Sequence, residues 1–91
     1  MVKPVHDWVL SPHAVDEMRR RGIDRAIVQD VLAAPERRSS VRPGRDVLES
    51  RVTMEGKRYL VRAFVDVDRA PSEVVTVYRT SKISKYWRAG P

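Results

Sequence analysis

Apolar positions early in the chain recur with the spacing of an α-helix. In residues 14–18 they fall on one side of a helix, and Ser11 and Pro12 stand where an N-cap and a first helical residue are favoured. Gly22 follows where a helix commonly ends in a left-handed residue. We therefore predict a first helix over about residues 12–21.

A second helical pattern follows almost at once. Asp24 is a good N-cap, and Ile23 and Val28 have the spacing of a hydrophobic staple across the start of a helix. Pro35 ends the pattern, because proline cannot continue a helix. The buried side of this helix is expected to hold Ile27, Val28, Val31 and Leu32.

In the second half of the chain, apolar positions recur at every second residue, which is the period of a β-strand. This pattern predicts strands over residues 46–53, 57–67 and 73–79, and a turn at residues 55–56 joins the first two into a hairpin. Residues 37–42 form a weaker candidate strand, stopped by the proline and glycine that follow.

These elements predict a single α+β domain over residues 1–91. We expect the two N-terminal helices to pack on one face of a three- to four-stranded antiparallel sheet and to leave the other face open. Residues 80–91 are expected to form either a short helix capped by Thr80 or Ser81, or a flexible C-terminal tail.

Alternation along the strands decides which side chains share a face of the sheet. Eight residues are expected to point toward the helices: Leu48, Ser50, Val52, Val61, Ala63, Val65, Val75 and Val77. Six would then share the open face: Glu49, Arg51, Arg62, Phe64, Thr76 and Tyr78. A carboxylate, two guanidiniums, a hydroxyl and a phenol are thus predicted to line one concave surface.

The net charge of +6 arises in the second part of the chain. Residues 37–91 hold thirteen basic and six acidic side chains, whereas residues 1–36 hold five and six. This asymmetry favours a polyanion such as nucleic acid, or an acidic protein, as the partner. A basic surface can also serve solubility alone.

The sequence disfavours several classes of site. It has no cysteine, which excludes disulfides and thiolate ligands, and its two histidines and scattered acids suggest no metal site and no cofactor. It offers neither a glycine-flanked nucleophilic serine nor a glycine-rich phosphate loop. The apolar runs are too short for a signal peptide or a membrane span, so we expect a cytoplasmic protein.

Two short motifs resemble a known family. The pattern S-P-H-A…M-x-x-R-G-I is made by Ser11, His13, Ala14, Met18, Arg21, Gly22 and Ile23, and residues 74–78 read V-V-T-V-Y. In this order they resemble the bacterial family named domain of unknown function 4258, which is itself similar to the RelE/ParE-like toxin superfamily. The resemblance implies a RelE-like fold. The chain departs from the family at Glu17, where a basic residue is common.

The toxin superfamily includes metal-independent ribonucleases, so the resemblance implies RNA as a target and an acidic antitoxin as a partner. Members rely on clustered Lys and Arg with a C-terminal Tyr, and some bind other targets without cutting RNA. In this chain the candidates for a nucleic-acid-binding cluster are Arg79, Lys82, Lys85 and Tyr86, directly after Tyr78.

Cleavage of RNA without a metal needs a base, an acid and cations for the phosphate. Either Glu49 or His13 can serve as the base, and the other of the pair or Tyr78 as the acid. Arg51 and Arg62 would hold the phosphate, because a planar guanidinium matches its oxygens. His13 is expected near the positive end of a helix dipole, which disfavours imidazolium and suits a base.

Each candidate also has an ordinary structural explanation. His13 can be an exposed first-turn histidine, while Glu49 and Arg51 can belong to a solvated salt-bridge network. The sequence therefore leaves open a toxin-like metal-independent endoribonuclease, a nucleic-acid- or protein-binding module without catalysis, and an α+β domain whose role depends on its partner. A homodimer would suit an exposed Phe64 and Trp87.

Overall fold

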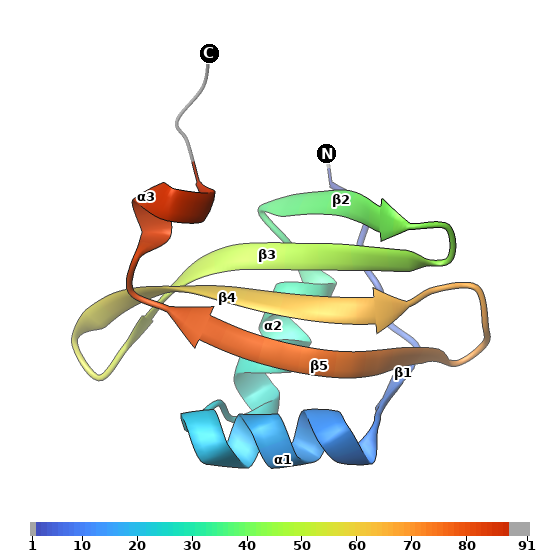
Figure 1. Ribbon diagram of the computed structural model, residues 1–91, viewed down its shortest axis with the longest axis horizontal. Coiled ribbons are helices and arrows are strands. Elements are labelled where there is room, and N and C mark those ends of the chain that lie inside the picture. The colour runs from blue at the N-terminus through green and yellow to red at the C-terminus, as the bar shows by residue number, and fades with distance from the viewer. Residues whose placement is uncertain (1, 88–91) are drawn as a thin grey trace.

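The chain folds into one five-stranded sheet with helices against it (Figure 1). The structure, a computed structural model, describes residues 2–87. Its elements in chain order are β1 (Trp8–Leu10), α1 (Pro12–Arg21), α2 (Arg25–Ala33), β2 (Arg37–Arg42), β3 (Arg45–Met54), β4 (Lys57–Asp66), β5 (Ser72–Thr80) and α3 (Ile83–Tyr86). The strands lie in the order β1-β5-β4-β3-β2. The predicted α+β class is confirmed.

Both N-terminal helices begin where the capping pattern predicts. The Ser11 hydroxyl accepts a hydrogen bond from the Ala14 N–H at 3.0 Å, and Gly22, at φ 66°, ends α1 in the left-handed conformation. Asp24 occupies the N-cap position of α2 with an extended backbone, but its side chain makes no capping bond. Ile23 and Val28, on either side of this cap, are both buried in the core.

The predicted three- to four-stranded antiparallel sheet is wrong in the number of strands and at one edge. Trp8–Leu10 pairs in parallel with residues 72–74 of β5, and the ladder runs directly into α1 through a bond from the Ser11 N–H to the Val74 carbonyl at 3.0 Å. A three-residue strand is too short to show an alternating pattern, and its partner lies more than sixty residues further along the chain. Nothing local in the sequence therefore indicates it.

The two helices close one side of the sheet in different ways. In Figure 1, α2 lies behind the sheet, whereas α1 lies along β5. The Ser11 hydroxyl donates to the Val75 carbonyl at 3.0 Å, and the Arg21 guanidinium lies 5.7 Å from the centre of the Tyr78 ring, so α1 runs beside β5 in the same direction. Both helices contribute to one core, whose members include Ala14, Met18, Val28, Val31, Leu32, Leu48, Val61, Ala63, Val65 and Val77.

A β-bulge in β5 makes one residue differ from its predicted orientation. Phe64 pairs with Thr76, but Val65 pairs with Val74, which leaves Val75 as an extra residue between them. Val74 is therefore fully buried in the core, and Val75, which was expected there, is not among the core residues. Alternation resumes after the bulge, so Val77 faces the core as predicted.

After β5 the chain turns back over the sheet as far as residue 87, the last residue that the structure describes. Residues 81–87, hereafter the C-terminal segment, contain the single turn of α3, which starts at Ile83 rather than at Thr80 or Ser81. Of the two alternatives expected for residues 80–91, a short helix is therefore present at residues 83–86. Residues 88–91 lie outside the described part of the chain. In that described part, no helix is long and apolar enough to cross a membrane.

The bulge predicts different costs for two neighbouring valines. Val74→Ala removes methyl groups from a fully buried site and should lower the free energy of unfolding by about 2 kcal/mol. Val75→Ala, at a half-buried position, should cost well under half of that. Urea denaturation of the two variants measures both values, and an equal loss in both would show that the register of β5 is different.

Candidate functional site

Four charged or polar side chains form a row across the open face, one from each of four strands. Register places Arg37, Glu49, Arg62 and Tyr78 directly opposite one another, and we call this set the Glu49 row. The Glu49 carboxylate accepts from Arg37 Nε at 3.0 Å with Oε1 and from Arg62 Nε at 2.7 Å with Oε2. Arg62 also donates to the Tyr78 hydroxyl. The row is therefore one continuous hydrogen-bonded chain.

A tight turn between β3 and β4 sets which residues of these two strands lie opposite each other in the row. β3 and β4 are joined by Glu55 and Gly56, both at positive φ (53° and 76°), which is the geometry of a two-residue hairpin. From that turn the pairing continues without a shift, so Glu49 comes to lie opposite Arg62. Glu49 is only 1% exposed, an unusual position for a carboxylate unless cations pair with it.

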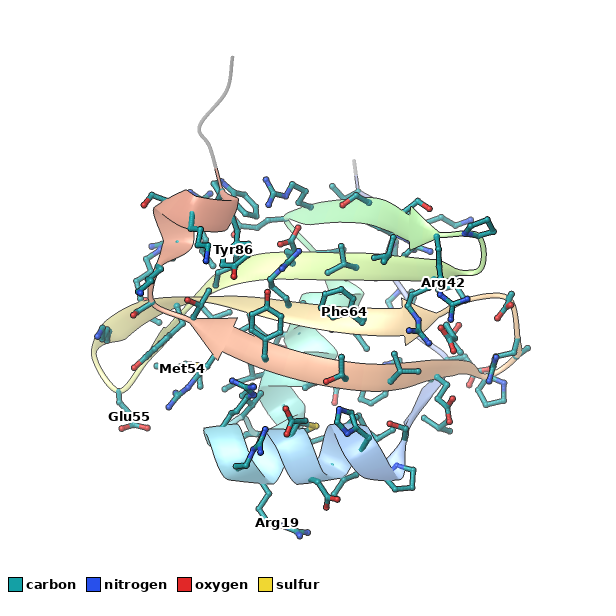
Figure 2. The ribbon with its side chains drawn as sticks, viewed as in Figure 1. Arg19, Arg42, Met54, Glu55, Phe64 and Tyr86 are labelled. Atoms are coloured by element: carbon teal, nitrogen blue, oxygen red, sulfur yellow. The ribbon has the colours of Figure 1, made fainter. Side chains whose placement is uncertain are left out.

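Aromatic rings surround the Arg62 guanidinium. It lies 5.3 Å from the centre of the Phe64 ring, 5.4 Å from that of Tyr78 and 4.8 Å from that of Tyr86. Phe64 and Tyr78 stack with an interplanar angle of 16°. Figure 2 shows Phe64 on the open face and Tyr86 on the C-terminal segment above it. The expectation that Phe64 is exposed is wrong, since this ring is half-buried.

The C-terminal segment lies over the next row of the same face. Trp87 packs against two guanidiniums, since its ring centre lies 4.2 Å from Cζ of Arg37 and 4.5 Å from Cζ of Arg51. Arg37 also donates to the Tyr86 carbonyl at 2.6 Å. Trp87 is thus half-buried, and its expected exposure is also wrong. Leu60, which pairs with Arg51 but lies outside the helix-side core, is fully buried, so this end of the face is covered.

Burial changes the acidity of the phenol in the row. The pKa of Tyr78 is raised above its ordinary value because the ring and hydroxyl are removed from water, and this outweighs the opposite effect of Arg62. The phenol therefore stays protonated at neutral pH. A protonated hydroxyl that already accepts a bond from a cation is suited to donate its own proton.

The predicted catalytic residues fall into three groups. Glu49, Arg62 and Tyr78 are in direct contact. Arg51 shares their face, but its guanidinium is paired with Glu36 at 2.9 Å. His13 is exposed in the first turn of α1 and, among residues 2–87, makes no side-chain hydrogen bond. It lies two residues after Ser11, which is bonded to β5, and about 12 Å along the helix axis from Arg21.

The predicted nucleic-acid-binding residues are also divided. Arg79 follows Tyr78 in the strand and so points to the opposite side, where its guanidinium lies 4.5 Å from the centre of the Tyr59 ring. Lys82 and Lys85 are exposed on the C-terminal segment, and Tyr86 faces the Glu49 row. Tyr86, Lys82 and Lys85 thus border the open face, whereas Arg79 does not.

Sequence reasoning missed Arg37 and the position of Trp87. Strand 37–42 was expected, with its observed bounds, but the partner of Arg37 depends on a one-residue irregularity between Ser40 and Arg42. Trp87 reaches the site through a reversal of the chain after β5, which no periodic pattern indicates. The tryptophan itself, in a segment rich in lysine and tyrosine, was the available signal.

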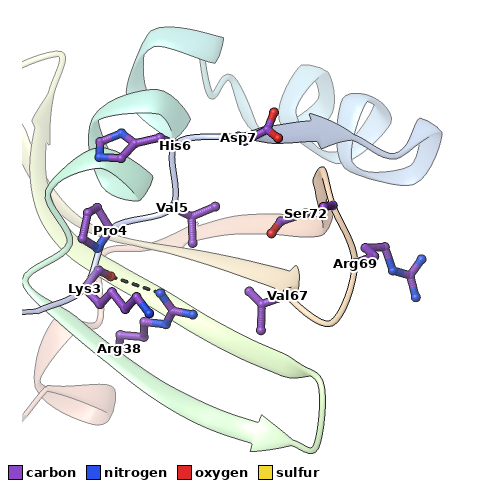
Figure 3. A pocket seen from close by; sticks show the side chains of 10 residues that line it. Lys3, Pro4, Val5, His6, Asp7, Arg38, Val67, Arg69 and Ser72 are labelled. Atoms are coloured by element: carbon purple, nitrogen blue, oxygen red, sulfur yellow. Dashed lines mark hydrogen bonds between the residues drawn. The ribbon is translucent and has the colours of Figure 1, made fainter.

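A concave region away from the Glu49 row lies between the N-terminal segment and the loop before β5. Figure 3 shows this cavity of about 270 Å³, where Arg38 donates to the Lys3 carbonyl at 3.2 Å. Its arginines are already occupied: Arg38 pairs with Asp46 at 2.8 Å, and Arg69 with Asp66 at 3.6 Å. In residues 2–87 no three His, Asp or Glu side chains cluster to hold a metal ion. The Glu49 row is therefore the stronger candidate site.

Comparison with known proteins identifies the family of the chain. The family model described as "Domain of unknown function (DUF4258)" matches residues 10–79, which run from the end of β1 almost to the end of β5. The match includes all four members of the Glu49 row and the first turn of α1, but not the C-terminal segment. No curated protein and no solved structure shows significant similarity to the chain.

Removing the charge of Glu49 should destabilise the fold. In Glu49→Gln, the amide can accept from only one of the two guanidiniums and directs an N–H group at the other. We expect the free energy of unfolding to fall by about 2–4 kcal/mol, less than for a fully enclosed pair because Arg37 is partly exposed. Glu36→Gln is the matched control, because the Glu36–Arg51 pair is much more exposed and should matter far less. Urea denaturation compares the two; equal losses would contradict the importance of the row.

The burial of Tyr78 predicts its behaviour in alkali. Its raised pKa means that the folded protein holds the phenolic proton more tightly than the unfolded chain. This contribution to stability is fully present below the ordinary tyrosine pKa of about 10 and is lost as the pH rises above it. The tyrosinate absorbance of wild type minus that of Tyr78→Phe should show a step above pH 10 or so, and a step at or below the ordinary value would be the contrary result.

Proposed function

Because the chain belongs to the DUF4258 family, whose description leaves its activity open, we propose a function from the site itself: the protein is a toxin-like endoribonuclease that binds RNA on its open face and cuts it without a metal ion. The observation that carries this proposal is the Glu49 row, in which one buried carboxylate holds two guanidiniums beside a protonated phenol.

The two guanidiniums are arranged to receive an anion. Each uses its Nε to reach Glu49, and each has five N–H donors in all, so donors remain on both Arg37 and Arg62. The carboxylate fixes the planes of both groups before any ligand arrives. A phosphate oxygen is the anion that paired arginine forks match best in shape and charge.

The surroundings of the row suggest which group does which chemistry. Attack of the RNA 2′-hydroxyl on the adjacent phosphorus forms a P–O bond and breaks the P–O bond to the 5′ oxygen, leaving a cyclic phosphate and a 5′-hydroxyl. Tyr78 is assigned as the acid that protonates the departing oxygen, since its proton is retained at neutral pH. Arg37 and Arg62 stabilise the charge on the phosphorane.

The base is assigned to His13 rather than to Glu49. Glu49 already accepts from two guanidiniums and is nearly inaccessible, so it acts as a positioning residue. His13 is exposed in the first turn of α1, about 12 Å along the helix axis from Arg21, which contacts Tyr78, so its proposed role requires bound RNA to bring the scissile phosphate within reach of both groups. Arg51 and the exposed Lys82 and Lys85 add positive charge along the path.

An acidic antitoxin of the RelE/ParE type is proposed as the partner. The proposal is supported by the excess of basic residues after position 36 and by the edge strand β2, whose residues 39–42 are exposed with no strand on their outer side among the described elements. An extended acidic segment could add to this edge by backbone hydrogen bonds.

A binding module without catalysis is the second candidate. The specific observation in its favour is that every member of the Glu49 row is already hydrogen-bonded within the row, as in a structural network, while His13 stands apart from it. Such a module would bind RNA through the same arginines and release it intact.

An assay with purified protein tests the proposal. Single-stranded RNA in the presence of a chelator should be cut by the wild type, and Arg62→Ala should reduce RNA affinity by about 10- to 100-fold through loss of a charged hydrogen-bonding group. Tyr78→Phe should keep RNA binding but slow cleavage by about 100- to 10,000-fold, and His13→Ala should act likewise.

Arg19→Ala is the matched control, because it removes the same charge from the side of α1 that points away from the sheet (Figure 2). It should leave both binding and cleavage close to those of the wild type. If the protein binds RNA in a salt-dependent way but does not cut it, the proposal of a ribonuclease fails and that of a binding module stands. Binding that Arg62→Ala leaves unchanged would exclude the open face altogether.

A further inference from the structure

Trp87 packs against two cationic side chains, hereafter the two walls of its slot. The guanidiniums of Arg37 and Arg51 lie 4.2 and 4.5 Å from its ring centre, so two positively charged groups face one flat aromatic system. One wall, Arg37, is also a member of the Glu49 row, and the other is held in place by Glu36 at 2.9 Å. Both walls are thus fixed by carboxylates that do not depend on Trp87.

The segment that brings Trp87 into this slot is weakly attached. α3 is a single turn, and none of its residues is buried. Within the segment, the Trp87 N–H donates to the Ile83 carbonyl at 2.8 Å, the Lys85 N–H to the Lys82 carbonyl at 3.2 Å and the Lys82 N–H to the Thr80 hydroxyl at 3.1 Å. Its contacts with the sheet face are the bond from Arg37 to the Tyr86 carbonyl at 2.6 Å and the packing of the Tyr86 and Trp87 rings on side chains of that face. Helix–sheet packing of the kind that fixes α1 and α2 is lacking here. The ring can therefore leave the slot without disturbing the core.

We propose that the space between Arg37 and Arg51 is a nucleobase-binding slot, which Trp87 fills when no RNA is bound. This inference rests on the proposed function, since it places the base of a nucleotide next to the phosphate that Arg37 and Arg62 hold. A nucleobase presents a flat π face like that of indole, and arginine planes stack on unpaired bases in RNA-binding proteins. The bound base displaces Trp87.

The chemistry of the slot restricts the ligand to unpaired nucleic acid. Bases inside a duplex are already stacked, and only a single strand can insert one base between two side chains. Stacking on a guanidinium requires a π face but no particular hydrogen-bonding edge, so the slot accepts different bases. The C-terminal segment accordingly acts as an internal competitor for single-stranded RNA.

The test uses Trp87 as its own reporter. The chain has two tryptophans, so Trp8→Phe leaves Trp87 as the only source of indole fluorescence. The probe is a short 2′-O-methyl oligouridylate, which cannot be cut because it has no free 2′-hydroxyl. Adding it should move the Trp87 emission toward that of solvent-exposed tryptophan, since the ring leaves the guanidiniums.

Affinity for the same probe gives the second measurement. Trp87→Ala should bind it about five- to thirtyfold more tightly, because the probe no longer competes with two cation–π contacts. Arg51→Ala, which removes one wall, should bind it more weakly. Trp8→Phe is the matched control: Trp8 also lies against an arginine, with its ring centre 4.6 Å from Arg25, but it lies on β1 and packs against the helix-side core.

The outcomes separate this inference from the proposed function. Weaker binding by Trp87→Ala would show that the ring is part of the RNA-binding surface, and unchanged binding would show that the slot is not used; either result overturns the inference. If Arg62→Ala still weakens binding, the proposed function survives that failure. If Arg62→Ala binds the probe as tightly as the wild type, the proposed function fails with it.

Discussion

The carboxylate of Glu49, nearly inaccessible to water and held between two guanidiniums, is the interaction on which the open face depends. A lone buried charge would be strongly unfavourable, and two arginines side by side would repel each other. Together the three groups satisfy one another across strands β2, β3 and β4. The centre of the sheet can therefore carry two neighbouring guanidiniums, because the carboxylate of Glu49 lies between them.

The same two arginines connect the centre of the sheet to the C-terminal segment. Arg62 lies against the rings of Tyr78 and Tyr86, and Arg37 lies against that of Trp87. The C-terminal segment is consequently held by contacts to groups that Glu49 orients, rather than by a hydrophobic core. Rigid charges beneath and a loosely attached cover above give a surface that is ordered in advance and yet accessible.

Most of the fold could be predicted from the sequence, because capping residues and two simple periods mark α1, α2 and the main strands. The site could be predicted only where alternation is unbroken, as for Glu49, Arg62 and Tyr78. Arg37 shows the limit. Counted back from the tight turn after β2, Arg37 would oppose Ser50 and face the core, but an irregularity of one residue shifts it to Glu49. Bulges and the parallel pairing of β1 depend on tertiary contacts, which local patterns do not contain.

The attachment of α1 has a consequence for how this family can diversify. The helix is fixed at its start by Ser11 on β5 and near its end by Arg21 at Tyr78, so His13 and the Glu49 row lie on separate elements joined through one strand. Under the proposed function, a substitution at the start of α1 would change the base and leave the ionic row intact. Cleavage and anion binding would then reside on separate parts of the chain and could vary independently among related proteins.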